Sequence, residues 1–113
     1  MTLDEFWEVI EATLAELPPA FRDRLDYTVV TVDEGPPGNL LGLYEGVPES
    51  RRGYANMDTI TLYKQALERE ARSPEELPRL IRETLLHEIG HHFGLNEDEV
   101  RRATYPEAPK PPL

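Results

Sequence analysis

The three histidines of the chain fall within one short segment, His87-Glu88-Ile89-Gly90-His91-His92. On a helix, His87 and His91 project from the same side, one turn apart, so two imidazoles can bind one zinc ion. Glu88 lies next to that pair, where a carboxylate can take a proton from a metal-bound water. The spacing therefore predicts the minimal chemistry of a zinc-dependent hydrolase.

A catalytic zinc site takes three protein ligands and leaves one position for water, so a third ligand is needed. The chain has no cysteine, and His92 lies about 100° around the helix from His91, which favours a structural role for it. Gly94 can turn the chain back so that Glu97 meets the metal, and Asp98 is the alternative third ligand. Acids are also favoured in the first turn of a helix without any metal, so both assignments stay open.

The helix that carries the motif is expected to be largely buried. Its apolar residues surround most of its circumference; they are Leu80, Ile81, Leu85, Leu86, Ile89 and Phe93. Polar side chains in such a helix need a compensating partner. A metal and a water supply one, which favours a metal site over a solvent-exposed polar face.

The elements around the motif follow from local signals. Thr2 and Glu5 form a capping box for a helix over 3–17, which Pro18-Pro19 ends. Pro78 is incompatible with the interior of one uninterrupted helix, so a short turn at 74–77 is predicted before the main helix from Pro78 to Phe93. Alternation and β-branched residues predict strands over 27–32, 40–44 and 59–63. Two further helices are predicted over 64–71 and 97–104.

These elements predict an α+β fold with a small three-stranded sheet. A length of 113 residues favours one domain, assigned to 1–105. Residues 106–113 contain four prolines and are expected to form an extended or disordered tail.

Charge and composition exclude several classes of partner. A net charge of −10 argues against binding to nucleic acid or to an anionic membrane. No apolar stretch is long enough to cross a bilayer, and the acidic N-terminus lacks the basic region of a signal peptide. A cytoplasmic protein, monomeric by default, is the expectation.

The sequence resembles the mini-zincins, a family of small bacterial zincin-like metallopeptidases. The matching stretches are Leu43-Tyr44-Glu45-Gly46, Ile60-Thr61-Leu62-Tyr63 and Leu86-His87-Glu88-Ile89-Gly90-His91-His92-Phe93-Gly94-Leu95. The resemblance implies a minimal zincin-like fold in which the helix with the His-Glu-x-x-His motif carries the zinc ligands. The family usually has Asp or His where this chain has Glu97, and no methionine follows the motif as it does in metzincins.

The predicted function is zinc-dependent hydrolysis of a peptide or protein substrate, with Glu88 as general base. The resemblance further implies that a sheet edge pairs with the substrate, and the strand at 59–63 is the predicted edge. The tyrosines considered for stabilising the oxyanion are Tyr44, Tyr54, Tyr63 and Tyr105. Two alternatives remain: a metal-binding protein without protease activity that acts as an interaction module, and a hydrolase of another amide.

Overall fold

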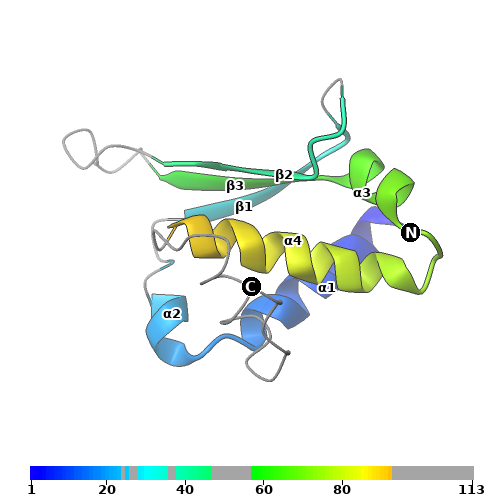
Figure 1. The fold of residues 1–113 in the computed structure, drawn as a ribbon. Helices are drawn as coiled ribbons and strands as arrows, with labels where there is room; N and C mark the ends of the chain where they lie inside the picture. The colour runs from blue at the N-terminus through cyan, green and yellow to red at the C-terminus, as the bar shows by residue number, and fades with distance from the viewer. Residues whose placement is uncertain (24, 26–27, 36–37, 47–56, 93–113) are drawn as a thin grey trace, which may run out of the picture.

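The computed structural model of the chain describes residues 1–23, 25, 28–35, 38–46 and 57–92. In chain order the elements are α1 (Leu3–Ala15), α2 (Pro19–Asp23), β1 (Thr28–Asp33), β2 (Gly42–Glu45), β3 (Asp58–Tyr63), α3 (Lys64–Glu70) and α4 (Glu76–His92). Helices α1 and α4 lie on one side of the three-stranded sheet (Figure 1). The predicted α+β class is therefore confirmed, and the predicted helix at 97–104 and the tail at 106–113 lie outside the described residues.

The first helix begins at the predicted capping box. The backbone N–H of Thr2 donates to the Glu5 carboxylate at 2.9 Å, and the N–H of Glu5 donates to the Thr2 hydroxyl at 3.1 Å. The helix ends at Ala15, two residues before the predicted end. The short helix α2 was not predicted; Pro19 is its first residue, where the missing N–H of proline has no intrahelical partner to lose.

The sheet has the order β1-β3-β2, with β3 parallel to β1 and antiparallel to β2. Ile60 and Leu62 of β3 have no exposed surface and face the helices. Thr61, between them, points to the other face, where it accepts a hydrogen bond from the Thr31 hydroxyl at 3.2 Å. The prediction that 59–63 is a sheet edge is wrong, because strands pair with β3 on both sides. Among the described strands, β2 lies at an edge instead.

The predicted break before the main helix is also wrong in its position. Helix α4 begins at Glu76, whose N–H donates to the Ser73 hydroxyl at 3.2 Å. Pro78 is the third residue of the helix, and the first four N–H groups of any helix lack an intrahelical acceptor. The proline therefore removes no hydrogen bond, and one helix runs from Glu76 to His92.

The core is formed by one face of α4, one face of α1, Leu67 of α3 and the inner face of the sheet. Its fully or nearly fully buried members are Phe6, Ile10, Ile60, Leu62, Leu67, Leu77, Ile81, Leu85 and Ile89. Four of them, from Leu77 to Ile89, recur along α4 at four-residue intervals, so the helix is anchored over more than three turns. None of the helices in the described ranges has both the length and the apolar character needed to span a bilayer.

Candidate metal centre

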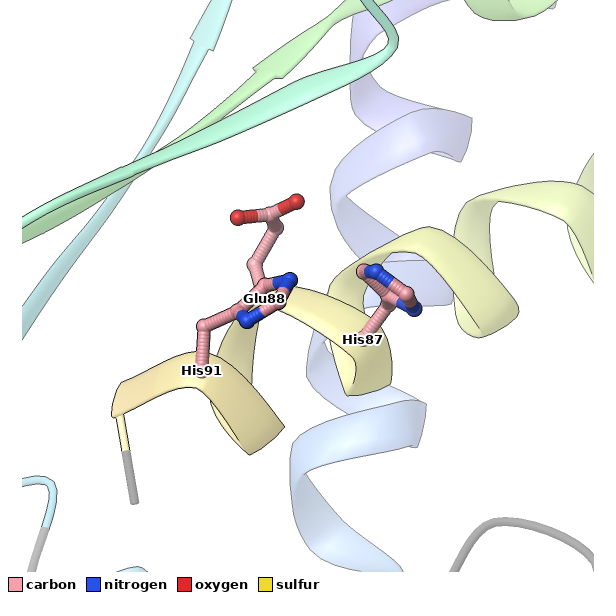
Figure 2. A group of neighbouring side chains, drawn as sticks. All are labelled: His87, Glu88 and His91. Carbon is pink, nitrogen blue, oxygen red and sulfur yellow. The ribbon is translucent and has the colours of Figure 1, made fainter. Parts of the chain in front are cut away.

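Two histidines and a glutamate meet on one turn near the end of α4. The potential ligand atoms of His87, Glu88 and His91 all lie within 4.8 Å of one another. The imidazole rings of His87 and His91 lie edge to face, with centroids 4.7 Å apart and an interplanar angle of 80°. Figure 2 shows the three side chains rising from α4, with the carboxylate of Glu88 extended toward the strands.

The position of Glu88 depends on strand β2 as well as on its own helix. Gly42, the first residue of β2, is buried against α4. A Cβ atom added to Gly42 would lie 3.3 Å from Glu88 Cγ and 3.0 Å from Thr84 Cγ2. Since glycine has no Cβ, the strand can approach the helix closely at this point. Glu88 is consequently 9% exposed, between α4 and the sheet edge.

The donor set fits a zinc ion. Zinc binds imidazole nitrogen at about 2.0–2.1 Å, so two such ligands in a tetrahedral site lie about 3.3 Å apart. The potential ligand atoms of His87 and His91 lie within 4.8 Å of each other on one turn of the helix, so both imidazoles are placed to share one ion. Within the described residues, this is the one place where three histidine or acidic side chains cluster so closely.

The two candidates for the third ligand cannot be placed. Glu97 and Asp98 lie outside the residues that the structure describes, as does Gly94, which was predicted to turn the chain toward the metal. The structure likewise does not describe the side chain of His92. The choice between Glu97 and Asp98 therefore stays a prediction.

The sequence did not predict that the first residue of β3 is a buried carboxylate. Asp58, the first residue of β3, is 1% exposed and accepts a hydrogen bond from the Tyr44 hydroxyl at 3.1 Å. A side chain at Gly46 would displace Tyr44, because a Cβ there would lie 2.8 Å from the hydroxyl oxygen. The only signal in the sequence was an acid directly before an alternating strand.

This hydrogen bond also affects which tyrosine hydroxyl could stabilise the oxyanion of the reaction. The single hydroxyl hydrogen of Tyr44 is directed at Asp58, so it is not offered to a substrate in this arrangement. Tyr63 lies on the opposite face of β3 from Ile60 and Leu62, away from α4. Tyr54 and Tyr105 lie outside the described residues.

Comparisons with known proteins agree with this geometry. The model of the zincin-like metallopeptidase family matches residues 16–105. A solved structure of a conserved hypothetical protein from Thermus thermophilus superposes with a TM-score of 0.59 at 28% identity, covering 82% of this chain and 94% of that one. A search of curated proteins gives no match. Because the family model spans most of the chain, including the His87–His91 motif, the chain belongs to the zincin-like metallopeptidase family.

Proposed function

We propose that the protein is a zinc-dependent peptidase that hydrolyses peptide bonds. The observation that carries the proposal is the convergence of His87, Glu88 and His91, whose potential ligand atoms lie within 4.8 Å of one another on one turn of α4. Membership of the zincin-like metallopeptidase family supports the same activity. His87 and His91 would hold the zinc, and Glu97 or Asp98 would complete the ligand set.

Glu88 is the group that moves protons in this proposal. Bound zinc would polarise the scissile carbonyl and make water more acidic. Glu88 takes a proton from the attacking water as the water oxygen bonds to the carbonyl carbon, and then gives that proton to the leaving amine nitrogen as the C–N bond breaks. Its limited exposure, 9%, keeps the carboxylate close to α4 and β2 and restricts the orientations that it can adopt.

Strand β2 is the proposed site of substrate pairing. One of its edges is bonded to β3, and within the described ranges no strand pairs with the other. An extended peptide could add to this edge through backbone hydrogen bonds, which depend little on its sequence. Because Gly42 lies against Glu88, a peptide on this edge would pass beside the candidate general base.

The decisive experiment compares Glu88→Gln with Glu8→Gln, the same change at an exposed position of α1. Zinc content and cleavage of an unfolded protein mixture are measured for both variants and the wild type. General base catalysis contributes about 10²–10⁴-fold, so Glu88→Gln should bind zinc and lose cleavage by a factor of that order. Glu8→Gln should match the wild type.

Two results would count against the proposal in different ways. A wild-type protein that binds zinc and cleaves no peptide would be a metal-binding module, the alternative raised by the sequence. Cleavage that survives Glu88→Gln unchanged would retain a peptidase but remove Glu88 from its mechanism.

A further inference from the structure

A cleft of about 350 Å³ opens between the beginning of β2 and α4, directly beside the candidate metal centre. His87 and Glu88 form part of its lining. Three leucines contribute aliphatic surface: Leu40 and Leu41 precede β2, and Leu80 comes from α4. A side chain in the cleft would therefore contact leucine residues while the rest of its molecule lay beside the candidate general base.

The cleft follows one stripe of α4 toward the metal centre. Leu80, Thr84 and Glu88 are separated by four residues each, so they lie on one side of the helix. Leu80 precedes Glu88 by two turns, which is about 12 Å along the helix axis. Neighbouring residues of an extended peptide are about 3.4 Å apart. The near end of the cleft, at Gly42 and Glu88, therefore adjoins a bond held at Glu88, and its far end at Leu80 lies about three to four peptide residues away.

The strand side of the cleft presents an exposed leucine on a fixed backbone. Leu40 is 46% exposed, among the most exposed large apolar side chains in the described part of the chain. The next residue, Leu41, accepts a backbone hydrogen bond from Tyr63 of β3 at 3.0 Å. A cleft of this volume, lined by apolar side chains with a few polar groups, is typical of a ligand site.

Two carboxylates line the cleft, and Glu83 is the one outside the candidate metal centre. Glu83 also lines the cleft and would attract a basic side chain. Its carboxylate, however, accepts a hydrogen bond from Arg79 at 2.9 Å and forms an ion pair with it. Arg79 offsets the charge of Glu83, and Glu88 belongs to the candidate metal centre at one end of the cleft. A side chain that contacts the leucines therefore meets mainly aliphatic lining.

We propose that this leucine cleft, formed by Leu40, Leu41 and Leu80, binds a large apolar side chain of a peptide substrate next to the cleaved bond. The occupant is a residue such as leucine or phenylalanine, and small, acidic and basic residues are disfavoured. The inference rests on the proposed peptidase function, since it assigns the substrate class of the same site. Gly42 and Thr84 also line the cleft, at the place where strand and helix approach closely.

Peptide binding tests the cleft without relying on turnover. The zinc-loaded Glu88→Gln protein is titrated, with fluorescence anisotropy as readout, into labelled, blocked peptides that differ only in a central leucine, alanine or lysine. Apolar pockets discriminate side chains of different size by about 10-fold or more. The leucine peptide should therefore bind about 10-fold more tightly than the alanine peptide, and lysine should give no gain.

Leu40→Ala and Leu3→Ala, each added to Glu88→Gln, separate the cleft from general effects of removing an exposed leucine. Leu3 is 48% exposed, against 46% for Leu40, and it is not part of the cleft. Leu40→Ala should remove most of the preference for the leucine peptide, while Leu3→Ala should keep it. Equal binding of the leucine and alanine peptides, tighter binding of lysine, or equal effects of the two variants would overturn the assignment.

Cleavage by the wild-type protein distinguishes this inference from the function on which it rests. Cleavage sites in an unfolded protein mixture, mapped by mass spectrometry, should have large apolar residues enriched on one side of the cut bond. Cleavage without such enrichment rejects the leucine cleft but keeps the peptidase. Selective binding of the leucine peptide without any cleavage rejects the peptidase and leaves a peptide-binding cleft.

Discussion

Helix α4 has two faces that contribute to the protein in different ways. One face carries Leu77, Ile81, Leu85 and Ile89, with exposed fractions between 0% and 5%, and it packs in the core with α1 and the sheet. The other carries His87, Glu88 and His91 beside β2. Core packing of the apolar face holds the helix in place, and the side chains of the polar face are positioned by the helix that carries them. Substitutions on the first face should therefore change stability, and substitutions on the second should change metal binding and chemistry.

Removing a core leucine should have the largest effect on stability. Leu85 has no exposed surface, and a buried Leu→Ala change costs about 2–5 kcal/mol because it leaves a cavity. Urea unfolding should show a loss of this size for Leu85→Ala, while Leu3→Ala on the surface should change the free energy by less than about 0.5 kcal/mol. Similar losses for both would contradict the division of α4 into a core face and a site face.

Zinc should stabilise the protein through ligands on the polar face of α4 and not through its core face. A ligand present at about 100 times its dissociation constant adds about 2.7 kcal/mol to the free energy of unfolding. The wild type and Leu85→Ala should both gain this increment in thermal or urea unfolding, and His87→Ala should lose most of it. An undiminished gain in His87→Ala would exclude this histidine as a ligand.

The contact between β2 and the polar face should show a smaller, specific effect. A methyl group at Gly42 would lie 3.0 Å from Thr84 Cγ2 and 3.3 Å from the Thr61 carbonyl oxygen. Overpacking of this kind costs about 1 kcal/mol or more, so Gly42→Ala should destabilise the protein and slow cleavage. Thr84→Ala removes the nearer contact, so the double variant should regain part of the loss; strictly additive effects would show that the two residues do not interact.

The capping box of α1 lies away from the candidate metal centre and should give the smallest effect. The backbone N–H of Thr2, followed by its side chain, lowers the pKa of Glu5 by hydrogen bonding. A folded-state pKa below the unfolded one stabilises the fold above the unfolded pKa, and this contribution is lost as pH falls through the folded pKa. The stability difference between wild type and Glu5→Gln should therefore shrink on acidification, with zinc affinity at neutral pH unchanged in both.

Local patterns predicted most of the elements because their causes are local. The capping box at Thr2 and the strands near 28–33 and 58–63 follow from residues close in the chain. One local signal was misinterpreted. Pro78 was expected to start a helix, yet it fits within the first turn of α4 once Ser73 caps Glu76.

Strand order could not be deduced in the same way. The alternation of residues 59–63 indicates that one face of this strand is buried, but it does not indicate which strands pair with it on either side. The pairing of β3 with both β1 and β2 depends on connections and packing across the whole domain. This is why the predicted edge was placed on the central strand.

By itself, the sequence determined which side chains share one turn of a helix. The spacing of His87, Glu88 and His91 is enough, because helical geometry relates residues three and four apart in the same way in every helix. Only the tertiary structure decided what faces that turn. Gly42 against Glu88, Tyr44 bonded to the buried Asp58, and the leucine cleft beside the metal centre all join segments distant in the chain. Such contacts arise from packing of the complete core, and no local pattern of residues encodes them.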